Sequence, residues 1–296
     1  MRYRNKLDKY IKMHKNNTIT EEIKCALPDT QNQTDIRDIP IDKVGIKNLK
    51  YPITVKDRDG GVQHTVATVA MTVDLPKEFK GTHMSRFVEV LMNKKEIHID
   101  SIFEILKEMQ NKLHANSAHI ELDFPYFKEK LAPVSRKPSL IDYRIKFHAV
   151  VNKNKKDVIM TVVVPVKTLC PCSKNISKYG AHNQRGEVTV AVRFNDIVWF
   201  EDVISIVEQS ASCELFTLLK RDDEKYVTEK AYENPVFVED VVRNVVTKLK
   251  QNEKILWYHV EAENFESIHN HNAYAMIESH ESFSNGHAKD FMIKRF

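Results

Sequence analysis

One order of elements, two strands, two helices and two strands, is predicted twice along this chain of 296 residues, and this repeat constrains the fold most strongly. Apolar and polar side chains alternate, with many β-branched residues, in the strands predicted for the first half. These strands are residues 44–55, 62–75, 118–124 and 140–151. The DRDGG segment at residues 57–61 predicts a hairpin turn. Helices are predicted over residues 84–92 and from Ser101, which with Glu104 would form a capping box.

The second half repeats this order. Its predicted strands are residues 158–166, 187–194, 256–264 and 273–281. One helix is predicted over residues 200–219, and another begins with Asn234 as N-cap and Pro235 at the first helical position. The charged KRDDEKY segment between them is expected to be a loop. We therefore predict an α+β fold of two tandem ββααββ units, each an antiparallel sheet with its helices on one face.

The predicted units span residues 41–152 and 153–284, and the second carries the reactive residues discussed below. Residues 1–40 are polar and lack a sustained period, which predicts a mobile N-terminal arm, and residues 285–296 are expected to form a C-terminal tail. Sheets of this kind leave edges and a second face that need partners, so we also expect self-association into closed barrels.

Charge and composition exclude several classes of protein. Lys plus Arg number 45 against 41 Asp plus Glu, and this mild excess is spread along the chain, so no nucleic-acid partner is expected. The longest apolar run, residues 158–166, is too short for a membrane span, and no membrane association is expected. Four cysteines give no disulfide framework, which favours reduced thiols in a cytoplasmic protein.

Reactive side chains concentrate in TLCPCSKNISKYGAHNQRGE at residues 168–187, a stretch without hydrophobic periodicity. Cys170 and Cys172, followed by His182, could supply thiolate and imidazole to one divalent metal ion. Neighbouring cations, Lys174 among them, would favour the thiolate form. The alternative is a pair of inert thiols in a surface loop, and the spacing alone leaves both readings open.

A third metal ligand would be a carboxylate, and the pattern does not choose among four that follow: Glu208, Glu214, Glu224 and Glu239. Late in the chain, His269 and His271 stand two residues apart between the last predicted strands. They could reach a common pocket, or they could be polar turn residues.

Four segments together resemble the type IB GTP cyclohydrolase I family, metal-dependent enzymes of the tunnelling fold that open the guanine ring of GTP. They are KGTHMSRF at 80–87, PVKTLCPCSKNISKYGAHNQRG at 165–186, LLKRDDEKYVTEKAYENPVFVED at 218–240 and FESIHNHNAYA at 265–275. The second and third are long and specific. The family's fold uses paired ββααββ units that assemble into barrels, in agreement with the repeat predicted above.

The resemblance implies a site. Its metal ligands would be Cys170, His182 and Glu224, and its catalytic groups His269, Cys172 and His182. Glu239 would anchor guanine by accepting hydrogen bonds from N1–H and the 2-amino group, and His269, or His271, would move protons. Candidates for holding the triphosphate are Lys80, His83, Arg86, Lys174 and Arg185.

The reaction implied is hydrolysis of GTP to 7,8-dihydroneopterin triphosphate and formate, the first step of tetrahydrofolate biosynthesis. One divalent metal per site, zinc, manganese or iron(II), would activate water, and the implied assembly is a homotetramer. Two alternatives remain. An archaeal-type cyclohydrolase would give a cyclic-phosphate dihydroneopterin, and a non-catalytic purine- or pterin-binding protein would be expected to have lost a thiol, imidazole or carboxylate, all present here.

Overall fold

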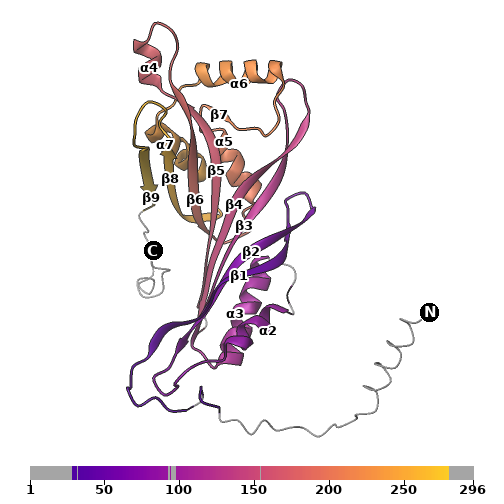
Figure 1. The fold of residues 1–296 in the computed structure, drawn as a ribbon, viewed down its shortest axis with the longest axis vertical. Helices are drawn as coiled ribbons and strands as arrows, with labels where there is room; N and C mark the ends of the chain where they lie inside the picture. The colour runs from indigo at the N-terminus through magenta and orange to yellow at the C-terminus, as the bar shows by residue number, and fades with distance from the viewer. Residues whose placement is uncertain (1–28, 32, 93, 95–97, 154, 280–296) are drawn as a thin grey trace, which may run out of the picture.

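A computed structural model describes residues 29–31, 33–92, 94, 98–153 and 155–279 (Figure 1). Most of the predicted N-terminal arm, the end of the last predicted strand and the predicted tail at 285–296 lie outside the described residues. The described part of the arm segment contacts the loop after residue 75, where Lys80 N donates to Gln33 O and Gly81 N to Gln31 O. Among described residues, no helix is long and apolar enough to cross a membrane.

One antiparallel sheet of nine strands organises the molecule (Figure 1). Its order is β1-β2-β3-β4-β5-β6-β8-β9, with β7 paired to β5. The strands of the first unit are β1 (Ile41–Lys56), β2 (Val62–Leu75), β3 (Ser117–Leu131) and β4 (Pro138–Asn152). Those of the second are β5 (Lys155–Leu169), β6 (Asn183–Phe194), β7 (Cys213–Glu214), β8 (Ile255–Asn264) and β9 (Ala273–Glu278). The pairing of β4 with β5 makes the sheets of both units continuous.

Most of the described helices cover one face of this sheet and bury one hydrophobic core, whereas the short helix Pro171–Ile176 buries no side chain. The first unit contributes α2 (Met84–Met92) and α3 (Ile99–Leu113), and the second contributes α4 (Pro171–Ile176), α5 (Phe200–Glu208), α6 (Arg221–Glu233) and α7 (Val238–Leu249). Along β3, alternate residues are buried because the strand period of two turns them toward the helices: Ala118, Ile120, Leu122, Phe124 and Tyr126. The predicted α+β fold is confirmed, and the first unit has the predicted ββααββ order, whereas the second adds α4, β7 and α6 to it.

The predicted start of α3 is wrong. Its N-cap is His98, whose Nδ1 accepts from Ser101 N at 3.3 Å while Ser101 Oγ accepts from His98 N at 2.9 Å. Ser101 is therefore the third helical residue, and its side chain accepts the hydrogen bond from the backbone N–H of the N-cap. Glu104 pairs instead with Lys94 Nζ at 2.5 Å.

The single helix predicted over residues 200–219 is also wrong, because α5 ends at Glu208. Hydroxyl groups compete with the helical ladder after that point. Ser210 Oγ donates back to Ile206 O at 2.7 Å, and Ser212 Oγ accepts from Leu169 N at 3.0 Å. Residues Cys213–Glu214 then form β7 against β5.

The charged segment predicted to be a loop forms the N-cap and first turns of α6, and the predicted cap of the following helix is wrong too. Asn234 C-caps α6, and its side-chain amide donates to Ala211 O at 2.9 Å. The next helix, α7, begins after Phe237, whose N–H donates to Asp240 Oδ2 at 3.1 Å. Pro235 lies in the short link between the helices.

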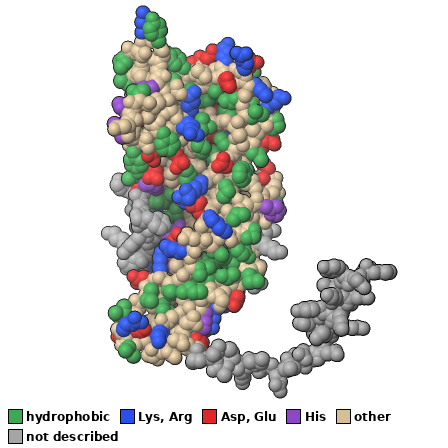
Figure 2. All heavy atoms as spheres, in the orientation of Figure 1, with side chains coloured by type: hydrophobic (Ala, Val, Ile, Leu, Met, Phe, Trp, Pro, Cys, Tyr) green, Lys and Arg blue, Asp and Glu red, His purple; other side chains and the backbone are tan. Residues whose placement is uncertain are grey.

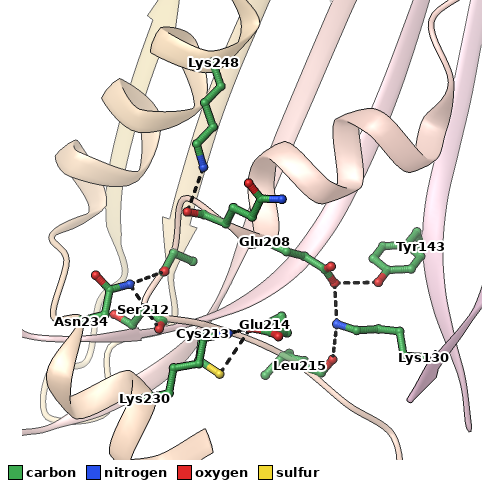
Figure 3. A network of polar contacts seen from close by, with 12 residues as sticks. Lys130, Tyr143, Glu208, Ser212, Cys213, Glu214, Leu215, Lys230, Asn234 and Lys248 are labelled. Atoms are coloured by element: carbon green, nitrogen blue, oxygen red, sulfur yellow. Dashed lines mark hydrogen bonds and ion pairs between the residues drawn. The ribbon is translucent and has the colours of Figure 1, made fainter. Parts of the chain in front are cut away.

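A buried ion pair fastens the two units together (Figure 3). Lys130 Nζ on β3 lies 2.8 Å from Glu208 Oε1 at the end of α5, and the two side chains are only 10% and 12% exposed. The same carboxylate accepts from Tyr143 OH at 2.8 Å, and Lys130 also donates to Leu215 O at 2.9 Å. Burial, followed by the charge of Glu208, raises the pKa of Tyr143, so its hydroxyl remains a donor. Glu208 is thus engaged in structure and is not available as a metal ligand.

Replacing Lys130 by Met should lower the free energy of unfolding by about 3 kcal/mol, because the Glu208 carboxylate would stay buried without its cation. Urea denaturation followed by circular dichroism measures this. The matched control is Arg144→Met, which removes an exposed pair with Asp123 and should cost less than about 1 kcal/mol. Equal losses in the two variants would contradict the stabilising role of the buried pair.

Candidate active site

Cys170 and His182 are neighbours at the point where β5 and β6 separate. Cys170 N donates to His182 O at 3.1 Å, one step beyond the last strand pair, Leu169 with Asn183. Cys170 is also the N-cap of α4, with its Sγ accepting from Ser173 N at 3.4 Å. Ser173 Oγ in turn accepts from His182 N at 3.1 Å. The predicted loop therefore contains a short helix, and Ser173 in its first turn contacts both Cys170 and His182.

The His182 ring is oriented by its surroundings. Its Nδ1 lies 3.0 Å from Gln184 Oε1, and Gln184 Nε2 is fixed by donating to Thr168 Oγ1 at 2.9 Å. Glu266 Oε2 lies 3.6 Å from the same Nδ1, and the His182 and Glu266 side chains are 14% and 12% exposed. With Nδ1–H directed at these acceptors, the Nε2 lone pair is left for a metal ion or a proton.

The loop between β8 and β9 lies beside this pair. Phe265 N donates to Arg185 O at 3.0 Å, which extends the contact of β6 with β8 past the strand end. Beyond it the rings of His269 and His271 are exposed and stack at 5.1 Å. The Arg185 side chain is exposed and has no hydrogen-bond or ion-pair partner within the described residues.

The start of α7 reaches the same end of the sheet. Val236 N donates to Leu169 O at 3.2 Å, next to Cys170, and Glu239 follows in the exposed first turn of α7. Lys174 of α4 donates to Tyr232 O at 2.5 Å and lies over the Tyr232 ring, so its ammonium group ties α4 to α6. One end of the sheet thus gathers Cys170, Cys172, Lys174, His182, Arg185, Glu239, Glu266 and His269.

Glu224 does not join this group within one chain. The C-terminal end of α6 carries Tyr232 and faces α4, whereas Glu224 lies eight residues earlier, about 12 Å along the helix axis (Figure 1). Its side chain is exposed and makes no hydrogen bond or ion pair with the described residues. Among those residues, no three His, Cys, Asp or Glu side chains are grouped so as to hold a metal ion.

Three predicted triphosphate ligands lie at the opposite end of the sheet. Val73, near the end of β2, aligns through Ala118 and Val151 with Lys156 at the start of β5. Leu169 lies thirteen residues beyond Lys156, which corresponds to about 43 Å along the strand. Lys80, His83 and Arg86 follow β2, so a single chain does not bring them to Cys170.

These three side chains also have local roles. Arg86 Nη1 donates to Lys112 O at 3.0 Å near the end of α3, and His83 Nε2 lies 3.3 Å from Asp29 Oδ2. Lys80 Nζ lies 3.5 Å from Gln33 Oε1. Within one chain, the contacts of these side chains are therefore structural.

Comparison of the sequence with known proteins assigns the chain to a family. The family described as "Type I GTP cyclohydrolase folE2" matches this chain over residues 27–275. The chain belongs to this family. GTP cyclohydrolase FolE2 of Nitrosococcus oceani is 56% identical over 263 residues, covering 88% of this chain and 98% of the relative. The proteins of the same name from Methylobacillus flagellatus and Syntrophus aciditrophicus are 58% and 59% identical, over 85% and 84% of this chain and 95% and 98% of theirs.

Among solved structures, the urate oxidase of Bacillus subtilis is similar with a TM-score of 0.46 and 6% sequence identity, over 80% of this chain and 98% of that chain. The relatives in sequence confirm the predicted GTP cyclohydrolase I activity, and with it that the protein is an enzyme. The family match begins at residue 27, inside the segment predicted to be an arm.

The chain contains a carboxylate beside His182 that sequence reasoning missed. Glu266 stands in the FESIHNHNAYA segment that carries the resemblance, where the two histidines give the stronger chemical signal. The available signal was its position two residues after Asn264, where β8 ends beside the start of β6. Gln184 was missed for the opposite reason, since a neutral amide in a predicted strand gives no chemical signal.

Glu214 and Cys213 of this cyclohydrolase are engaged in structure. Burial, followed by the Glu214 charge, raises the pKa of the Cys213 thiol to about 11, so it stays protonated. Burial opposes ionisation of Glu214, yet the hydrogen bond from Lys230, with Nζ to Oε2 at 2.6 Å, holds its pKa below the ordinary value. Of the four carboxylates left open by the sequence, Glu208 and Glu214 are thus paired internally, whereas Glu224 and Glu239 are exposed.

Replacing Gly186 by Ala should disturb the cyclohydrolase site. An added Cβ would lie 2.6 Å from Asn264 Oδ1 and 3.0 Å from Glu263 O, and would push β8 and the following loop away from His182. Because small displacements of catalytic groups are costly, GTP turnover should fall about tenfold or more. Formate release measures it, with Thr189→Ala on the same strand as control. Wild-type turnover in the Gly186 variant would show that this close approach does not position the site.

Proposed function

We propose that this chain's GTP cyclohydrolase reaction takes place at the sheet end that carries Cys170 and His182. The products would be 7,8-dihydroneopterin triphosphate and formate. The observation that carries this proposal is that Cys170 and His182 are backbone neighbours across β5 and β6, while Nδ1 of His182 lies against Gln184 Oε1 and Nε2 remains available. We place the protein in the cytoplasm, where its free thiols would remain reduced.

The donor atoms of Cys170 and His182, which lie together in one chain, suit a divalent metal. Cys170 and His182 would supply sulfur and nitrogen, and Glu224 would supply an oxygen, a set that suits zinc, manganese or iron(II). When bound, such a metal lowers the pKa of a water ligand and so provides hydroxide for attack on C8 of guanine. Gln184 and Glu266 would keep the His182 ring in the required orientation.

The chain's other residues would bind substrate and move protons. Glu239, in the first turn of α7, would accept hydrogen bonds from N1–H and the 2-amino group, which guanine has and adenine lacks. His269 would exchange protons with the opening ring, and Cys172 would lie close to the reacting atoms. Arg185, exposed and unpaired within the described residues, would be available to bind the triphosphate.

Assembly would complete the site. Glu224 is exposed and remote from Cys170 in its own chain, so we propose that it serves the Cys170 and His182 of a second copy. Lys80, His83 and Arg86 would likewise reach a triphosphate only in another copy. The tip of the loop containing α4 projects beside the site with apolar and basic side chains (Figure 2), and Ile176 and Tyr179 there are 81% and 87% exposed.

The outer strands of the sheet support the same view. In the described chain, β1 and β9 each pair on one side only. Unpaired edges are readily covered by another sheet. We propose that copies join into closed barrels and that the assembly is a homotetramer, which sedimentation analysis of the purified protein would establish.

Purified protein should release formate from GTP and yield a fluorescent pterin after oxidation, and chelation of divalent metal should abolish both. Cys170→Ala, His182→Ala and Glu224→Gln should each lose bound metal, measured by elemental analysis, together with activity. His269→Ala should lose activity but keep its metal, because it would act on protons only. Full activity in a metal-free preparation would contradict the metal proposal, and the absence of both products would contradict the reaction.

Sharing of ligands between copies can be tested by mixing inactive chains. Co-expressed Cys170→Ala and Glu224→Gln chains should recover about a quarter of wild-type activity per site, because random mixing places an intact Cys170 opposite an intact Glu224 in about one site in four. The matched control combines Cys170→Ala with His182→Ala, which damage the same half of the site and should not recover. If the first mixture is as inactive as the control, the ligands come from one chain.

A further inference from the structure

We propose that Asp223 is a positioning residue for the metal site: it locks the first turn of α6 onto the first unit and thereby fixes the place of Glu224. This inference rests on the proposed role of Glu224 as a ligand. Asp223 itself would contact neither metal nor substrate.

The Asp223 carboxylate is fully buried and receives four hydrogen bonds. Its Oδ1 accepts from Val134 N and Ser135 N, each at 2.8 Å. Its Oδ2 accepts from Ser135 Oγ at 2.6 Å and from Lys220 N at 2.8 Å. The bond to Lys220 is an ordinary capping interaction within α6. The other three come from the turn between β3 and β4, so this carboxylate does more than cap its own helix.

Glu224 depends on this attachment because its side chain has no other support in the described chain. Its backbone N–H donates to Lys220 O at 2.8 Å, the first hydrogen bond of α6, and its carboxylate is exposed without a partner there. The place of the carboxylate is therefore set by the first turn of the helix. That turn is set in turn by the buried bonds of Asp223.

Further tethers hold α6 toward its other end. Lys230 pairs with Glu214, and Tyr232 accepts from Lys174. Loss of the Asp223 contacts would leave these tethers in place, so α6 would stay attached while its N-terminal turn moved. A metal ligand tolerates little displacement, since metal–ligand distances in real sites vary by only about 0.2 Å. The expected result is a folded protein with a weakened metal site.

The test compares Asp223→Asn with Asp157→Asn in the full chain. Asp157 forms a similarly enclosed pair with Arg193, Oδ1 to Nε at 3.0 Å, and lies near the start of β5, at the end of that strand remote from Cys170. Titration calorimetry with Mn²⁺ should show affinity weakened about tenfold to a hundredfold in Asp223→Asn. The Asp157 variant should lose stability but bind Mn²⁺ as the wild type does.

A kinetic readout separates positioning from loss of the ligand. The activity of Asp223→Asn should recover as Mn²⁺ concentration rises, because its ligands are displaced but present. Glu224→Gln should stay inactive at every Mn²⁺ concentration. Ser135→Ala, which removes only the hydroxyl donor, should shift Mn²⁺ affinity in the same direction by a smaller factor, and it decides the matter if Asp223→Asn does not fold.

Unchanged Mn²⁺ affinity in a folded Asp223→Asn protein, with stability lowered as in Asp157→Asn, would overturn the inference and leave Asp223 as a structural cap. Equal affinity in Ser135→Ala and wild type would do the same if the Asp223 variant is unfolded. Failure of the underlying proposal looks different, because Glu224→Gln would then bind Mn²⁺ normally.

Discussion

The pairing of β4 with β5 joins the two units into a single sheet. Nine residue pairs, from Arg144 with Val163 to Asn152 with Lys155, turn two ββααββ units into one sheet with one core. The polar network around Glu208 and Lys130 reinforces this join on the helix side of the sheet. The described connections between strands consequently lie at one end or the other of long, aligned strands.

That alignment decides which of the candidate site residues lie together. The strand ends bring Cys170, His182, Glu266 and the start of α7 together, because β5 ends opposite the start of β6 and β8 ends close by, opposite Gly186. The same alignment separates this group from the loop after β2 by nearly the length of a strand. The predicted site residues therefore lie at two ends of one chain, and the proposed assembly with other copies would unite them.

The sequence predicted the regular parts of this fold well, since the local spacing of apolar residues in a strand or helix indicates which face is buried. It failed where side chains far apart in the sequence determine the ends of elements. After the end of α5, Ser212 Oγ accepts a hydrogen bond from Leu169 N. In the charged segment that forms the start of α6, Asp223 accepts a hydrogen bond from Ser135 in the turn between β3 and β4. Each of these contacts joins residues 43 or 88 positions apart, far beyond the few neighbouring residues from which a local sequence pattern is read.

For the site, the sequence by itself determined which chemical groups the chain possesses and, through long specific segments, the family to which they point. Spacing placed Cys170 and His182 near one another because they flank a single loop between paired strands. Only the tertiary structure decided that Gln184 and Glu266 contact the imidazole, that Glu208 and Glu214 are paired internally, and that Glu224 is exposed in the first turn of α6. Those outcomes depend on sheet register and helix docking, which are set by contacts between residues tens of positions apart.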